Sequence, residues 1–163
     1  MAAFDVSSST VIVFGYDGSD DAQRAIDVAS RLLSGQALVV HVLEPVPRGT
    51  GPAVARPGVP GAGMPALGQI EREIEQEARA VLEDGVRRAA DAGFDAEGQL
   101  VRARGGVFWR DLLDIVEQRG ASALVVGRRG RSGLRSVLMG SVSEGAVKHA
   151  AVPVLVVPPH PAP

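Results

Sequence analysis

Residues 127–141 read GRRGRSGLRSVLMGS, and they follow a short apolar run, ALVV at 123–126. This run is short and rich in β-branched residues, which predicts a buried strand, and helical spacing begins at Ser141. Glycine lets a backbone come close to a ligand, and a helix N-terminus presents unpaired N–H groups and partial positive charge. A strand that leads through a glycine-rich loop into a helix therefore predicts a phosphate-binding loop.

The spacing of the loop is G-x2-G-x9-G-S, formed by Gly127, Gly130, Gly140 and Ser141. It is not a P-loop, because that motif needs a lysine after its last glycine and the only lysine of the chain is Lys148. The stretch does not contain the pattern G-x-G-x-x-G either. It resembles the nucleotide-binding signature of the universal stress protein family, in its ATP-binding branch, and the resemblance extends over residues 11–158.

This resemblance implies that the chain binds ATP. It assigns the phosphates to the backbone of Gly130 and Gly140 and to the side chain of Ser141, and the ribose to Gly127. The neighbouring arginines suit a polyanion. Because no cluster of carboxylates adjoins the loop, bound Mg²⁺ or Mn²⁺ would be held mainly by the phosphates, and no metal-ligand or catalytic side chain is expected. The candidate nucleotide-binding residues are Gly15, Tyr16, Asp17, Val42, Gly127, Arg128, Arg129, Gly130, Arg131, Gly140, Ser141, Val142 and Ser143.

Asp17 follows the first apolar run of the chain. Asp-Gly is a common turn pair, so one interpretation is turn chemistry, with Ser19 or Asp20 capping the next helix. The other is a ligand role, since the carboxyl end of a parallel strand lies where doubly wound folds bind ligands. The resemblance supports the second interpretation. It matches Asp17 to the nucleoside, the backbone of Gly15 to the ribose, and Val42 to the adenine, mainly through its backbone.

Ser141 also begins a capping box, because Glu144 follows it three residues later. Capping alone would explain this serine, and the glycines would then form a long surface loop. The preceding glycine and the arginines at 128, 129, 131 and 135 fit a polyanion better than they fit a simple helix cap.

Apolar runs and helical periodicity alternate along the chain, which predicts one α/β domain over 10–158 with an open parallel five-stranded sheet and helices on both faces. The resemblance adds the strand order 3-2-1-4-5 of adenine nucleotide alpha hydrolase-like folds. Flexible segments are expected at 1–9, in the Pro/Gly-rich stretch 46–68 and at 159–163. Strands are expected at 10–16, 37–43, 97–104, 123–126 and 152–157, and helices at 22–33, 67–89, 107–118 and 141–150.

A length of 163 residues suits one well-buried domain. The net charge of −2, with 22% charged residues, gives no nucleic-acid-binding footprint. No apolar run reaches the length of a membrane span, and the absence of cysteine excludes disulfides and thiolate metal sites. We expect a cytoplasmic protein that binds neither nucleic acid nor membranes.

The hypothesis for function is a universal stress protein that binds ATP and acts in the stress response through nucleotide-dependent conformation or association, without fast catalysis. The alternatives are a slow ATPase or autophosphorylating enzyme and a regulator that binds cyclic AMP. A related nucleotide transferase would show His-x-Gly-His and a serine hydrolase G-x-S-x-G, and the chain contains neither. The client protein cannot be read from the sequence.

The last strand is expected at a sheet edge, where free N–H and C=O groups invite pairing with another chain. The resemblance implies a homodimer joined through the apolar residues Val152, Val154 and Val156 of this strand. Pro153 removes one donor from the ladder, so side-chain packing should matter more than backbone pairing. In the alternative, the Pro-rich tail folds over the edge and the protein is a monomer.

Overall fold

The computed structural model describes residues 10–44, 64–130 and 139–159. Expectations for the two tails, for residues 45–63 and for Arg131 and Arg135 concern positions outside these ranges. Within them, strands and helices alternate as predicted. The elements are β1 (Val11–Gly15), α1 (Asp20–Ala29), β2 (Gln36–Leu43), α2 (Met64–Asp91), β3 (Asp95–Arg102), α3 (Phe108–Gln118), β4 (Ala123–Gly127), α4 (Ser141–His149) and β5 (Val154–Val157).

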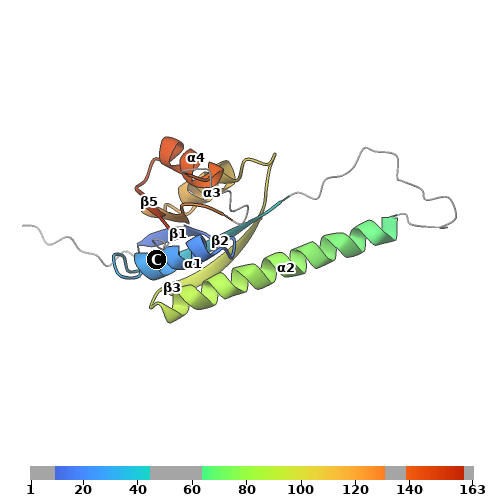
Figure 1. The fold of residues 1–163 in the computed structure, drawn as a ribbon, viewed down its shortest axis with the longest axis horizontal. Helices are drawn as coiled ribbons and strands as arrows, with labels where there is room; N and C mark the ends of the chain where they lie inside the picture. Colours follow the sequence, from blue (N-terminus) through green and yellow to red (C-terminus); the bar gives the residue numbers. More distant parts are fainter. Residues whose placement is uncertain (1–9, 45–63, 131–138, 160–163) are drawn as a thin grey trace, which may run out of the picture.

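The strands form one parallel sheet in the order β3-β2-β1-β4-β5, which confirms the predicted topology. Helices α1 and α2 pack on one face of the sheet, and α3 and α4 pack on the other (Figure 1). The winding reverses between β1 and β4, which lie side by side with Gly15 next to Val126. A doubly wound sheet has a crevice at such a reversal, at the carboxyl ends of the strands.

The core consists of two apolar clusters, one on each face of the sheet. Ile12 and Phe14 of β1 point toward α1 and α2, where Phe14 meets Phe94 edge-on at a centroid distance of 5.2 Å. Val13, between them in sequence, belongs to the cluster under α3 and α4. Because both faces of β1 are buried, its sequence is continuously apolar and does not alternate.

Helix α1 is shorter than its periodicity predicted, because it ends at Ala29 and not near Leu33. The hydroxyl of Ser30 donates to the carbonyl of Asp27 at 2.9 Å, and the backbone N–H of Leu33 donates to that of Ala29 at 2.8 Å. These bonds form turns directly after the end of α1. Leu32 lies in these turns, and it is 65% exposed.

Helix α2 begins earlier than predicted, at Met64, so that residues 64–68 of the stretch expected to be flexible are helical. β3 covers Asp95–Arg102 and not 97–104. The strand begins two residues earlier than predicted, because the turn at Gly93, with a φ of 96°, is complete before Asp95.

β5 begins at Val154, two residues later than predicted, so Val152 precedes the strand. Pro153 has no N–H, but its carbonyl accepts a hydrogen bond of 3.0 Å from the backbone of Leu124. Proline thus precedes the first residue of this edge strand.

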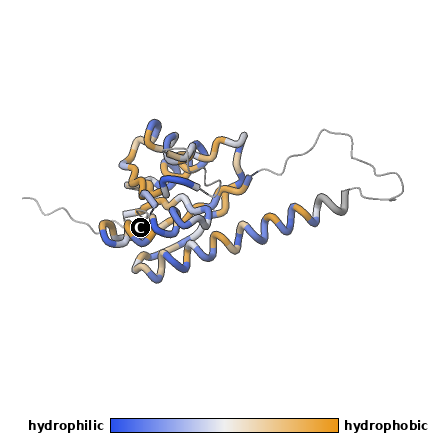
Figure 2. Tube along the Cα trace, in the orientation of Figure 1, coloured by the Kyte–Doolittle hydropathy of each residue, from blue (hydrophilic) through white to orange (hydrophobic). Residues whose placement is uncertain are grey.

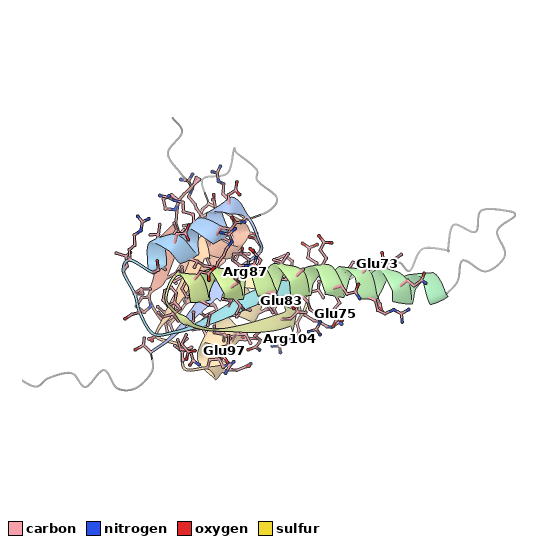
Figure 3. The ribbon with its side chains drawn as sticks, turned by 90° about the horizontal axis from the view of Figure 1, so that it is seen from below. Glu73, Glu75, Glu83, Arg87, Glu97 and Arg104 are labelled. Carbon is pink, nitrogen blue, oxygen red and sulfur yellow. The ribbon has the colours of Figure 1, made fainter. Side chains whose placement is uncertain are left out.

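With 28 residues, α2 is about 42 Å long at 1.5 Å per residue, and its N-terminal part extends beyond the sheet (Figure 1). Hydrophobic and hydrophilic residues alternate along it (Figure 2). Charged side chains follow its outer surface, among them Glu73, Glu75, Glu83 and Arg87 (Figure 3). Glu75 bridges to Arg102 of β3, which ties the helix to the edge of the sheet on its far side from β5.

Helices α3 and α4 meet through Trp109 and Gly145. A β-carbon on Gly145 would lie only 2.2 Å from the indole ring, so the absence of a side chain there allows this contact. The same ring stacks on His149 with a centroid distance of 4.5 Å and an interplanar angle of 10°. Trp109 therefore anchors α3 by packing on one surface of α4.

Candidate functional site

A cleft of about 490 Å³ opens at the carboxyl ends of β1, β2 and β4. This volume is in the range of small-molecule sites. All of the predicted site residues that the structure describes line it. They are Gly15, Tyr16, Asp17, Val42, Gly127, Arg128, Arg129, Gly130, Gly140, Ser141, Val142 and Ser143.

Asp17 and the glycine-rich loop meet at this cleft, although more than a hundred residues separate them in sequence. A β-carbon on Gly130 would lie 2.7 Å from Oδ2 of Asp17. The other oxygen of Asp17 accepts hydrogen bonds from the backbone N–H of Ser19 at 3.0 Å and from its hydroxyl at 2.6 Å. Asp17 thus performs the turn chemistry and also lines the cleft, so the two interpretations of the sequence are compatible.

The two ends of the loop are bonded to each other. The backbone N–H of Gly140 donates to the carbonyl of Arg128 at 2.8 Å. The hydroxyl of Ser143, which is only 2% exposed, lies 2.8 Å from the same carbonyl and 2.9 Å from that of Gly140. Ser143 therefore closes the loop, and it lines the cleft as part of this closure.

The predicted capping box is not formed. The N-cap of α4 is Gly140, with an extended backbone of φ −72° and ψ 157°, and Ser141 is the first helical residue. The carboxylate of Glu144 pairs with Lys148 at 2.6 Å and does not bond back to the helix start. Ser141 is exposed at the mouth of the cleft, so capping does not account for its presence.

The glycines of the loop are needed for close approach and not for unusual backbone angles. None of Gly127, Gly130 and Gly140 has a positive φ. A β-carbon on Gly127 would lie 2.7 Å from the backbone carbon of Asp21 and 2.9 Å from the nitrogen of Ala22. At this point β4 and the start of α1 touch backbone to backbone.

Asp21 is a site residue that the sequence analysis did not identify. It lies in the first turn of α1 and is 9% exposed. Its Oδ2 accepts a hydrogen bond of 3.1 Å from the backbone N–H of Arg129 and lies 3.6 Å from the guanidinium Nε of the same residue. A carboxylate in a helix's first turn normally stabilises that helix, so its local sequence gave no sign of a contact with the loop.

The floor of the cleft is fixed by the Tyr16 peptide. The Tyr16 N–H donates to the carbonyl of Val40 at 2.9 Å. The Tyr16 carbonyl lies 2.7 Å from Nδ1 of His41. Because a carbonyl only accepts, this ring nitrogen of His41 must be the donor. His41 is 7% exposed and hydrogen-bonded, as expected for a core histidine, and it also lines the cleft.

The Tyr16 ring packs against α2. Its hydroxyl donates to Asp84, and its ring packs so closely that a β-carbon on Gly85 would lie 2.6 Å from it. Burial, with the hydrogen bond to Asp84, raises the pKa of the Tyr16 hydroxyl well above its ordinary 10.0. The hydrogen bond from Tyr16, together with that from Arg88, holds the pKa of Asp84 below its ordinary 3.8.

We expect Tyr16 to remain protonated in the folded protein above pH 10.0, where a free tyrosine ionises. Unfolded chains would then bind fewer protons than folded ones, so stability should fall as the pH rises above this value. The chain has a single tyrosine, and phenolate absorbance during an alkaline titration reports its ionisation directly. An ordinary tyrosine titration while the far-ultraviolet circular dichroism stays native would contradict the buried hydrogen bond.

The lining of the cleft combines two kinds of surface. Val42, Phe108, Leu112 and Val142 supply apolar surface, which suits a flat ring system. Gly130, Gly140 and the two arginines 128 and 129 lie near the start of α4, and this part of the lining suits an anion. No group of three or more metal-ligating side chains occurs in the part of the chain that the structure describes. Within that same part, no helix is long and apolar enough to cross a membrane.

The fold and the cleft together define a doubly wound α/β protein with a cleft at the strand-order reversal and a glycine-rich loop at a helix start. The sequence profile described as "Universal stress protein family" matches residues 9–158, and the chain belongs to this family.

Individual relatives agree with this assignment. The universal stress protein YxiE of Bacillus subtilis is 30% identical over 141 residues, which cover 86% of this chain and 93% of the relative. The solved structure of the Methanocaldococcus jannaschii protein MJ0577 has a TM-score of 0.69 at 22% identity and covers 94% of this chain and 99% of its own. A universal stress protein from Archaeoglobus fulgidus, solved in complex with dAMP, has a TM-score of 0.60 at 25% identity and covers 91% of this chain and 97% of its own.

Proposed function

We propose that this protein binds ATP in the cleft between Asp17 and the glycine-rich loop. The observation that supports the proposal most is the convergence of these two segments on one cleft, which is lined both by apolar side chains and by the start of a helix. The relative from Archaeoglobus fulgidus has dAMP bound, which is consistent with an adenine nucleotide as ligand.

In the proposed complex the adenine lies on the apolar surface next to Val42, and the ribose lies near Asp17 and Gly127. The phosphates lie against the backbone of Gly130 and Gly140 and against Ser141, because residues without a side chain let an anion come close to the start of α4. Mg²⁺ or Mn²⁺ would accompany the phosphates and be held mainly by them.

Nucleotide binding would serve the stress response by changing conformation or association. ATP is an intracellular metabolite, so the proposed ligand favours a cytoplasmic location. Slow hydrolysis of ATP and binding of cyclic AMP are the competing functions, and the experiment below includes both.

Thermal unfolding with and without Mg-ATP tests the proposal. ATP at ~100 times its dissociation constant should stabilise the fold by about 2.7 kcal/mol, which raises the Tm of a chain of this size by roughly 5–11 °C. Parallel melts with cyclic AMP test for the cyclic AMP-binding regulator. Chromatography of the nucleotide after incubation tests for slow hydrolysis of ATP. An unchanged Tm at millimolar ATP would contradict the proposal, a larger shift with cyclic AMP would favour the regulator, and accumulation of ADP would favour the enzyme.

We also propose a homodimer joined along β5, which lies at the sheet edge. Val154 and Val156 are only partly buried against the core of their own chain. Free backbone groups along such an edge favour pairing with a second chain. Val152 precedes the strand, so its contribution would come from packing and not from the ladder.

Val154→Asp should convert the dimer into monomers, because it places a charge in the apolar interface, and light scattering at micromolar concentration measures the mass. The matched control is Ile70→Asp, since Ile70 is 45% exposed and lies on α2, which packs on β2 and β3 and not on β5. A wild-type mass of one chain would show that the edge is not an interface, and so would a Val154→Asp variant that keeps the wild-type dimer mass.

A further inference from the structure

The two adjacent arginines that follow β4 have different surroundings, although the sequence presents them as equivalent. Arg129 is held by Asp21, through the hydrogen bond of 3.1 Å to its backbone N–H and the approach of 3.6 Å to its Nε. The side chains of this pair are only 11% and 23% exposed, Asp21 being the more buried. The positive charge of Arg129 is therefore opposed by a neighbouring carboxylate inside the protein.

Within the residues that the structure describes, Arg128 has no such partner. Its Nε is buried and makes no hydrogen bond within the described residues. Both of its backbone groups are engaged, because its N–H donates to the carbonyl of Val157 and its carbonyl accepts from Gly140 and Ser143. The backbone of Arg128 is thus fixed on both sides, and the residue lines the cleft without an ion pair to any residue that the structure describes.

This difference has an energetic meaning. A buried donor on a charged group costs free energy when it lacks an acceptor, and an anion that supplies the acceptor recovers that cost on binding. A guanidinium whose charge is already paired gains less from the same anion. An arginine also offers a fixed fork of donors that matches the oxygens of a phosphate.

We propose that the two arginines have separate roles: Arg129, paired with Asp21, holds the loop against α1 as a positioning residue, and Arg128 supplies the charge that contacts the phosphates. This inference rests on the proposed function, because it concerns which residues of the same cleft meet ATP. It implies that Arg128 makes the site selective for nucleotides over the uncharged nucleoside. The pair of Asp21 and Arg129 holds the loop in place equally for both ligands.

Calorimetry with Mg-ATP and with adenosine tests the role of Arg128. Arg128→Gln should raise the Kd for ATP at least about tenfold, which corresponds to 1.4 kcal/mol, and leave the Kd for adenosine within about twofold of wild type. Arg128→Lys keeps the charge and should lose less. Arg110→Gln is the matched control, because it removes the same charge from an exposed residue outside the cleft, where Arg110 lies over Trp109.

The pairing of Asp21 with Arg129 is tested by a double-mutant cycle on the ligand-free protein. Arg129→Gln and Asp21→Ala should each lower the Tm, and the double variant should lose less than the sum of the two. Asp21→Asn keeps an acceptor for the Arg129 N–H and should recover part of the loss. Arg129→Gln should leave the ratio of the Kd values for ATP and adenosine as in wild type. Arg128→Gln, in contrast, should change this ratio.

The outcomes separate this inference from the proposed function. If wild type binds neither ATP nor adenosine, the function itself is overturned, and this assignment with it. If wild type binds ATP but Arg128→Gln keeps the wild-type ratio of the two Kd values, only the role of Arg128 is overturned. If Arg129→Gln changes that ratio as strongly as Arg128→Gln does, or if the two effects in the cycle simply add, the positioning role of Arg129 is wrong.

Discussion

Gly130→Val abolishes ATP binding while the protein remains folded: this is the first of the two largest effects that we expect. A β-carbon at this position would lie 2.7 Å from Oδ2 of Asp17, closer than such atoms approach, so the valine must displace the carboxylate or the loop. It also occupies the space in which the proposed phosphates meet the backbone. The substitution therefore affects the two segments of the cleft at once.

The fold should tolerate Gly130→Val, since the atom in conflict is the end of a side chain and not backbone. Calorimetry should detect no binding at millimolar ATP, and the far-ultraviolet circular dichroism should match wild type. Gly68→Val is the matched control, because a β-carbon at Gly68 meets nothing within 4 Å and this residue lies in α2 outside the cleft. Normal ATP affinity in Gly130→Val would show that the phosphates do not lie at this loop.

Gly127→Val is the second large effect, and here we expect the fold itself to be damaged. The added side chain would collide with the backbone of Asp21 and Ala22 at 2.7 and 2.9 Å, and backbone cannot move aside as a side chain does. Overpacking of a core typically costs 1–3 kcal/mol and sometimes more. We expect at least about 3 kcal/mol here, and thus a Tm lower by roughly 6–12 °C.

Denaturant unfolding of Gly127→Val, Gly127→Ala and wild type measures this effect. The alanine variant should lie between the other two, because it brings the clashing β-carbon without the two methyl groups of valine. Gly68→Val serves again as the reference for a valine that meets no neighbour. Wild-type stability in both Gly127 variants would mean that β4 and α1 do not touch backbone to backbone in solution.

Much of the fold could be predicted from the sequence, because the signals that decide it are local and strong. β1 and β4 are short apolar runs buried on both faces, and each is followed by a glycine or an Asp-Gly turn that ends the strand. The meeting of Asp17 with the loop followed from topology, since both lie at the carboxyl ends of neighbouring parallel strands.

The errors occurred where distant segments override a local pattern. The capping box at Ser141 is a valid local signal, yet the hydroxyl of Ser143 and the N–H of Gly140 bond to the carbonyl of Arg128, and the N-cap is Gly140 and not Ser141. The partnership of Asp21 with Arg129 spans 108 positions, so no window of sequence contains it. For this reason the sequence presents Arg128 and Arg129 as equivalent, although only Arg129 is paired with Asp21.

The contact between Trp109 and Gly145 gives the protein a built-in optical signal. Trp109 is the only tryptophan of the chain, and its indole lies flat on His149 of the helix that starts at the end of the glycine-rich loop. Indole emission responds to small changes in the packing of an adjacent ring, so any shift of α4 relative to α3 should alter its intensity. Binding of a ligand at the loop could then be followed by stopped-flow fluorescence on unlabelled protein. Such a measurement gives the rate of binding, which calorimetry and melting experiments do not give.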